Sequence, residues 1–200
     1  MLRLVAIVYW LALITWFAAL VAGGATAMAS FGTLSRIVPE LGITLPPFSE
    51  AEGAEAGRFV AGFVAERVFD ALATLEWVLI PVLLATVVIQ WLTRWPERGF
   101  ANSLRMALIL AASATTMFHL VVLSPRMDSA LADYRGAVRS GDLAAAASHK
   151  QLFDRDHRIS DPILRINGGL LLVAIVVSAA ILTPRSVPHR SGSGSGPVFR

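Results

Sequence analysis

Four long apolar stretches constrain the fold of this chain more than any other feature. They run about 4–28, 71–92, 106–123 and 163–183. A helix of roughly 20 apolar residues crosses a hydrocarbon core about 30 Å thick, and it satisfies its own backbone hydrogen bonds there. The sequence lacks the alternating segments of about ten residues that a membrane β-barrel needs. The pattern therefore predicts an all-α membrane protein, a four-transmembrane-helix bundle.

The composition supports this class and argues against several others. Of 200 residues, 56% are hydrophobic and 16% are charged, with a mean hydropathy of +0.65. The net charge is only +3, and no basic stripe interleaved with aromatic residues indicates a nucleic-acid site. Cysteine is absent, which excludes disulfides and thiolate metal sites. We expect the lipid bilayer as the main partner and no nucleic acid.

The chain is expected to form one membrane domain over residues 1–185, followed by a disordered Ser/Gly-rich tail over 186–200. Small residues at 25–29 could mark a signal-peptide cleavage site. The first apolar stretch is much longer than the usual 7–15 residues of such a peptide, so we favour a retained span.

The distribution of arginines predicts an orientation. The N-terminus, the short 93–105 connection and the tail carry seven arginines and one acidic residue. The 29–67 connection is acidic, whereas the 124–162 connection is mixed and holds six Lys and Arg residues. Because basic residues are enriched on the cytoplasmic side, we expect both termini in the cytoplasm and an inner-membrane location in a bacterial cell.

Amphipathic helices are expected in the two long extracytoplasmic loops. Pro39 and the Pro pair at 46–47 predict an irregular first half of the 29–67 loop. A capping box from Ser49 to Glu52 then predicts a helix that continues into the second span.

The 124–162 loop is expected to form two short helices, separated at 140–142, that lie on the membrane surface or cover the bundle. The Asp161-Pro162 pair is typical of a helix start and predicts the beginning of the last span.

Polar residues inside the spans define the candidate site. Glu76, His119 and Asn167 each lie five or six residues from the outer end of a span, about 8–9 Å deep at 1.5 Å per residue. An ionisable group within a span costs about 2.5–3.5 kcal/mol, so it is expected to avoid lipid. We therefore expect one shared polar pocket, with four further residues at its rim: Asp70, Arg126, His157 and Arg165.

Several functions of this pocket remain open. It could bind or pass a small solute, relay protons through its histidine, or form an internal network that fixes helix register. We expect no cofactor, but His119 and His157 could hold haem or a metal ion in an oxidoreductase or metal-handling protein. The common hydrolase, nucleotide-binding and zinc-protease motifs are absent, which favours a non-enzymatic protein. A protein partner or a homo-oligomer is a further alternative.

Two segments resemble a known family. Residues 117–127, Met-Phe-His-Leu-Val-Val-Leu-Ser-Pro-Arg-Met, end the third span with a Ser-Pro-Arg turn. Residues 153–160 and Asn167 give a Phe-x-x-x-His-x-x-Ser…Asn pattern. Both resemble the family related to transmembrane protein 205, whose bacterial members are described as domain of unknown function 4149.

The resemblance covers about residues 8–183 and implies a four-span membrane protein without an established biochemical activity. It implies five signature positions: Pro125, Arg126, His157, Ser160 and Asn167. Asp156, Pro162 and the long 36–66 insert depart from the family pattern. The family is distantly similar to four-span copper-resistance and haem-pathway membrane proteins, which is one reason for the histidine-cofactor alternative.

Overall fold

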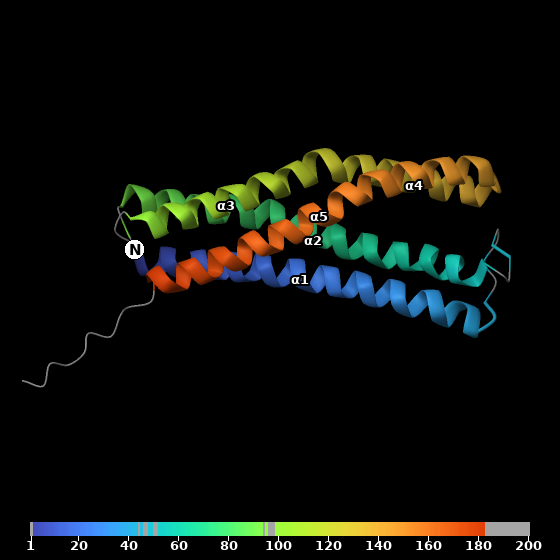
Figure 1. The fold of residues 1–200 in the computed structure, drawn as a ribbon, viewed down its shortest axis with the longest axis horizontal. Coiled ribbons are helices and arrows are strands. Elements are labelled where there is room, and N and C mark those ends of the chain that lie inside the picture. Colours follow the sequence, from blue (N-terminus) through green and yellow to red (C-terminus); the bar gives the residue numbers. More distant parts are fainter. Residues whose placement is uncertain are drawn as a thin grey trace, which may run out of the picture.

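The computed structural model describes residues 2–43, 45, 48–49, 52–93, 95 and 99–182. These residues are almost entirely helical and include no strand. The elements are α1 (Leu2–Glu40), α2 (Gly53–Leu92), α3 (Phe100–Phe118), the π-helical turn η2 (His119–Leu123), α4 (Ser124–Ser140) and α5 (Leu143–Leu182). Because α3, η2 and α4 follow one another without a break, the chain forms four long rods (Figure 1).

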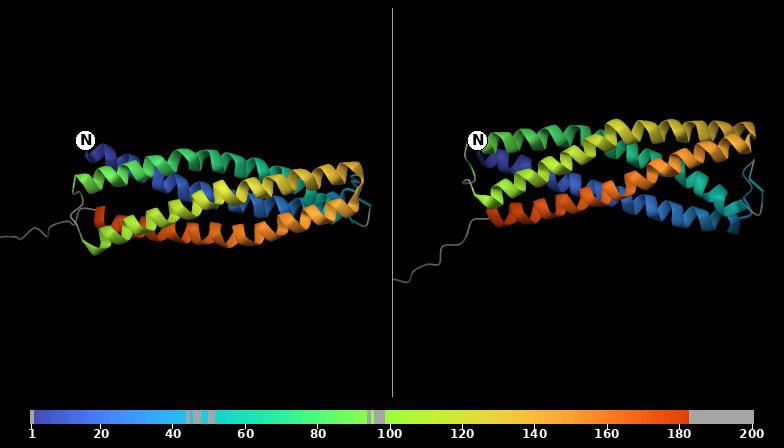
Figure 2. Two further views of the ribbon diagram at one scale, coloured as in Figure 1. Left: turned by 90° about the horizontal axis from the view of Figure 1, so that it is seen from above. Right: turned by 45° about the horizontal axis from the view of Figure 1, so that its top comes forward.

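Each rod is long and apolar enough to cross a membrane, as the sequence predicts. The rods hold between 39 and 41 residues, which corresponds to about 60 Å of helix. A hydrocarbon core is only about 30 Å thick, so each rod extends well beyond it. We call the end with the N-terminus and the α2–α3 link the near end, and the end with the α1–α2 and α4–α5 links the far end (Figures 1 and 2).

Much of the two long loops consists of helical continuations of the spans. α1 includes Pro39 and ends at Glu40, so the prediction of an irregular segment from residue 29 is wrong up to that point. α5 runs through Pro162, so the prediction that a helix starts at this proline is also wrong. Both prolines lie on exposed helix faces, and packing on each side keeps the rod continuous despite the lost backbone hydrogen bond.

The helices of the 124–162 segment also differ from the expectation that they lie flat on the membrane. α4 continues the third rod and the first half of α5 begins the fourth, and the two pack side by side at the far end (Figures 1 and 2). The predicted break between them is confirmed. Gly141 adopts a left-handed φ of 76°, which favours glycine, and Asp142 Oδ1 accepts a hydrogen bond from the Ala145 amide at 3.0 Å. The prolines at 46–47 and the 186–200 tail lie outside the described residues.

The start of α2 uses the two residues of the predicted capping box. The Glu52 carboxylate accepts hydrogen bonds from the Ser49 amide at 2.9 Å and from the Ser49 hydroxyl at 2.7 Å. These bonds favour the ionised carboxylate and lower the pKa of Glu52. The serine hydroxyl thus donates to the carboxylate instead of accepting from a backbone amide. As predicted, the helix that follows continues into the second span.

α1 and α2 form a tight antiparallel hairpin. A Cβ atom at Gly57 would lie only 2.2 Å from the Leu34 carbonyl oxygen, so a side chain at this position would clash with the backbone of α1. Towards the near end, side chains of all four rods enclose the main apolar core. Its fully buried members are Tyr9, Leu13, Trp16, Leu83, Ile109, Ala112, Leu171 and Ala174.

A second, smaller cluster joins the two helical hairpins at the far end. The ring of Phe59 on α2 lies 5.8 Å from that of Tyr134 on α4, centroid to centroid. Beside it, Arg135 Nη1 donates to Glu66 Oε2 at 2.7 Å, and the guanidinium carbon lies 3.9 Å from the centre of the Phe63 ring. Aromatic and ionic contacts therefore connect α2 to α4 in the part of the bundle that extends beyond the apolar spans.

Candidate functional site

The π turn η2 places the central histidine of the candidate site. In this turn the Ser124 amide donates to the His119 carbonyl, five residues earlier. Pro125 follows directly, has no amide hydrogen, and would clash with a carbonyl one turn earlier in a regular helix. A wider turn ahead of the proline relieves that clash, and such turns are frequent at functional sites.

His119 contacts α5 through one ring nitrogen. Its Nε2 lies 2.8 Å from Ser160 Oγ, and both side chains are buried. The second ring nitrogen, Nδ1, is buried and has no hydrogen-bond partner. His119 therefore has one nitrogen committed to helix packing and one that remains free to bond.

Asn167 makes the next polar contact towards the near end. Its Nδ2 donates to Thr116 Oγ1 at 2.7 Å, and its side chain is completely buried. The Thr115 hydroxyl lies 3.4 Å from Asn167 Oδ1 and also donates to carbonyl groups of its own helix. We call this contact closed, because both the oxygen and the nitrogen of the Asn167 amide have partners within the protein.

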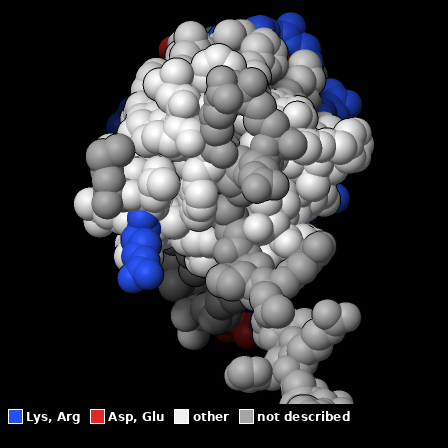
Figure 3. All heavy atoms as spheres, turned by 90° about the vertical axis from the view of Figure 1, so that its left-hand side faces the viewer, with Lys and Arg blue, Asp and Glu red and all other residues white. Residues whose placement is uncertain are grey.

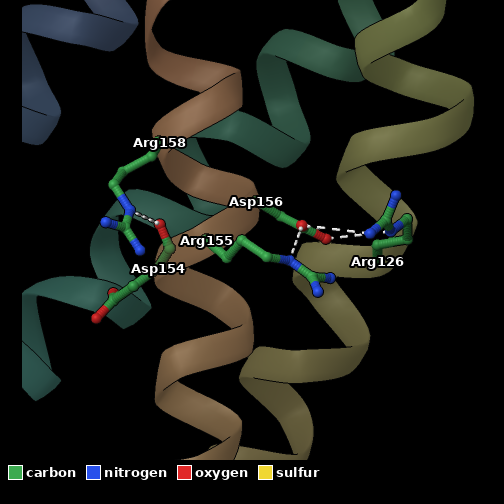
Figure 4. Close-up of polar contacts among 5 residues, drawn as sticks. All are labelled: Arg126, Asp154, Arg155, Asp156 and Arg158. Atoms are coloured by element: carbon green, nitrogen blue, oxygen red, sulfur yellow. Dashed lines mark hydrogen bonds and ion pairs between the residues drawn. The ribbon is translucent and has the colours of Figure 1, made fainter.

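Asp156 makes the corresponding contact towards the far end (Figure 4). Its carboxylate lies 3.1 Å from Arg126 Nε and 3.0 Å from Arg155 Nε. The Asp156 side chain is only 5% exposed, whereas both arginines are about half exposed and reach solvent. Asp156 was not among the residues expected at the site, although it lies four residues before Ser160 and so shares its helix face.

Together these contacts form a line between the third rod and α5, which we call the polar seam. It consists of three pairs: Arg126 with Asp156, His119 with Ser160, and Thr116 with Asn167. From Asp156 to Asn167 the seam extends about 16 Å along the bundle. Four of the eight candidate site residues belong to it: Arg126, His119, Ser160 and Asn167.

Glu76 does not belong to the seam. It accepts a hydrogen bond from Trp16 Nε1 at 2.9 Å, between α1 and α2. Leu20, one turn beyond Trp16, lies 3.5 Å from the Cβ position of Gly168 on α5. Glu76 thus pairs between α1 and α2, whereas His119 pairs with Ser160 between the third rod and α5.

No contact in the described part of the chain joins Glu76 to His119, so a single shared pocket stays a prediction. The physical premise still holds for these two groups, because Glu76 and His119 are both buried within the protein.

The remaining predicted residues lie on exposed faces. Asp70 and Arg165 pair within their own helices, with Arg67 at 3.7 Å and Asp161 at 2.9 Å. His157 is exposed, and its ring stacks on Phe153 with centroids 5.5 Å apart. The contacts in the described part of the chain do not bring His157 to His119. Among the described residues, no group of three or more potential His or carboxylate ligands could hold a metal ion.

A separate polar cluster at the near end was not expected as a site. Arg105 is 1% exposed, and its guanidinium carbon lies 5.1 Å from the centre of the Tyr9 ring. The Tyr9 hydroxyl bonds to Ser178 on α5. The sequence pattern shows Arg105 only as one of the basic residues before the third span. Arg105 lies four residues before Ile109 and eleven before Thr116, so the three share one helix face. Because Ile109 and Thr116 are buried, this spacing is the signal that Arg105 faces inward.

These features define an all-α integral membrane protein of four spans. A family model with the description "Domain of unknown function (DUF4149)" matches residues 48–135, which cover α2, α3, η2 and most of α4. The match includes His119 and Arg126 but ends before the residues of α5 that complete the polar seam. Searches of curated proteins and of solved structures found no match. The family match supports the resemblance to the bacterial family of unknown function.

Proposed function

We propose that this chain is a member of the DUF4149 family, related to transmembrane protein 205, and a non-enzymatic protein of the bacterial inner membrane that binds or passes a small hydrogen-bonding solute at His119. In this proposal the near end and both termini face the cytoplasm. The basic residues of the N-terminus and the 93–105 connection support that orientation.

The free nitrogen of His119 carries the proposal. A buried polar atom without a partner costs about 1–3 kcal/mol, so buried nitrogens are normally satisfied by protein, water or ligand. His119 Nδ1 has no partner in the described protein, while Nε2 is held by Ser160. A solute with a hydroxyl, amide or carboxylate group would satisfy Nδ1 without breaking that contact.

The position of His119 within the seam supports access from the far end. Beyond it lies the Arg126–Asp156 pair. The guanidinium group of Arg126 reaches solvent. Towards the near end lies the closed Thr116–Asn167 pair, which bounds the site on that side. A network that only fixes helix register would account for the closed Thr116–Asn167 pair. It leaves the free ring nitrogen unexplained.

A cysteine-accessibility experiment tests this proposal. The chain has no cysteine, so one introduced thiol reports on one position. We expect Ser160→Cys, in sealed membranes, to react with a small membrane-impermeant methanethiosulfonate added on the far side. Aqueous solute would reach the seam even though Ser160 is only 2% exposed in this structure.

The matched control is Leu123→Cys. Leu123 is also 2% exposed and follows His119 by one turn towards the far end, but it lies in apolar packing. We expect this variant to react about tenfold more slowly, because a buried apolar site excludes water. Equal rates in the two variants would contradict a solute-accessible seam.

A further inference from the structure

A groove opens on the near-end surface where α2 ends and α3 begins. It has a volume of about 400 Å³ and is lined by Trp91, Asn102, Ser103, Met106, Ala107 and Leu110. Ala107 and Leu110 are exposed and lie in the apolar stretch of the third rod. In a bilayer, this wall of the groove therefore faces acyl chains.

The end of the groove at the start of α3 is polar. Asn102 lines it, is 8% exposed, and has a buried Oδ1 without a hydrogen-bond partner. The oxygen is thus a desolvated acceptor, and a donor from a ligand would satisfy it. This feature is independent of His119, which lies towards the other end of the spans.

The electrostatics of this end favour an anion. The first amides of any helix have no partner within the helix. α3 begins after Gly99, which makes no side-chain capping bond to these amides. Such a terminus carries partial positive charge and binds phosphate well. The groove lining contains no acidic residue. The end-on view in Figure 3 shows mainly uncharged described atoms, with basic groups and a few acidic atoms at the edge.

We propose that this groove binds an anionic glycerophospholipid whose headgroup carries a hydroxyl. The phosphate lies on the free amides at the start of α3, the headgroup hydroxyl donates to Asn102 Oδ1, and an acyl chain follows Met106, Ala107 and Leu110. Trp91 lies at the groove as an aromatic residue suited to the membrane interface. Phosphatidylglycerol has the required phosphate, hydroxyl and acyl chains.

The experiment measures lipid binding to the purified full-length chain by native mass spectrometry, with phosphatidylglycerol, phosphatidylcholine and inorganic phosphate as separate probes. We expect the chain to prefer phosphatidylglycerol over phosphatidylcholine by about fivefold, because both carry a phosphate but only phosphatidylglycerol has a net negative charge and a headgroup hydroxyl that can donate to Asn102 Oδ1. Equal binding of the two lipids, or equally strong binding of inorganic phosphate alone, would overturn the proposal.

Two variants of Gly99 test the role of the helix start. A Cβ atom at Gly99 would meet nothing within 4 Å, and its φ of −165° is extended backbone that any residue adopts, so both variants are expected to fold. Gly99→Asp places a carboxylate where the phosphate would lie and should abolish the preference. Gly99→Ala adds only a methyl group, cannot accept a hydrogen bond from these amides, and should retain the preference. A preference unchanged in Gly99→Asp would contradict the proposed phosphate position.

A second pair of variants tests the apolar wall. Ala107→Trp would fill the groove and should reduce phosphatidylglycerol binding about fivefold or more. Ala114→Trp lies seven residues further along the same exposed face of α3, outside the groove, and should leave binding unchanged. Equal effects of the two substitutions would exclude this groove as the binding site.

Discussion

Replacement of Gly57 by valine is expected to separate α1 from α2 and to remove most of the stably folded protein. The Cβ position of Gly57 lies 2.2 Å from the Leu34 carbonyl oxygen and 2.7 Å from the Ser35 Cα. Both atoms belong to the backbone, so no side-chain rotation can make room. Overpacking of this kind costs about 3 kcal/mol or more. Thermal unfolding of the purified protein, followed by tryptophan fluorescence, would measure the loss.

Gly24→Val provides the matched control, because a Cβ at Gly24 would meet nothing within 4 Å. Gly24 is half-buried, but the space at its Cβ position is open, so valine would not displace a neighbouring helix. We expect its unfolding temperature to stay close to that of the unmodified chain. A Gly57→Val protein as stable as Gly24→Val would show that the two helices are not in contact at this position.

Arg135→Ala is expected to weaken the contact between the two hairpins at the far end. The Arg135 side chain is only 11% exposed, lies 2.7 Å from Glu66, and covers the ring of Phe63. Its removal leaves a partly buried carboxylate without its partner and exposes an aromatic ring. We expect a loss of about 2 kcal/mol, between the values of exposed and fully buried ion pairs. Faster hydrogen exchange in α2 and α4 would report the local opening.

Arg139→Ala removes the same charge one turn further along α4. Arg139 is exposed and donates only to the Arg135 carbonyl of its own helix. Its loss should change hydrogen exchange only at the end of α4. If Arg139→Ala and Arg135→Ala open the far end equally, net charge and not the contact with α2 stabilises this part of the bundle.

The helical class and the four spans follow from the sequence because lipid requires long, uncharged helices. The length of the rods does not follow from hydropathy. Beyond the spans the helices carry charged residues on exposed faces, and proline usually indicates a break. Here Pro39 and Pro162 lie on exposed faces, so each costs one backbone hydrogen bond without displacing a packed neighbour.

The sequence predicts which polar residues of the candidate site are buried, but not which residues they pair with. The cost of exposing a polar group to lipid predicts that His119, Glu76 and Asn167 are buried, and all three are. Their partners depend on how far each rod is shifted along its neighbour. Apolar stretches do not give that offset once the helices continue past them. For this reason Trp16, Thr116 and Asp156 emerge as partners only from the structure.

Short-range thiol cross-linking tests the central claim that polar groups of the four rods meet in separate pairs, Glu76 with Trp16 and His119 with Ser160. In the cysteine-free chain, His119→Cys combined with Ser160→Cys should be joined rapidly by a short bifunctional thiol reagent. His119→Cys combined with Glu76→Cys should be joined much more slowly, because Glu76 pairs with Trp16 between α1 and α2 and His119 with Ser160 between the third rod and α5. Efficient joining of residues 76 and 119, with none between residues 119 and 160, would contradict this account.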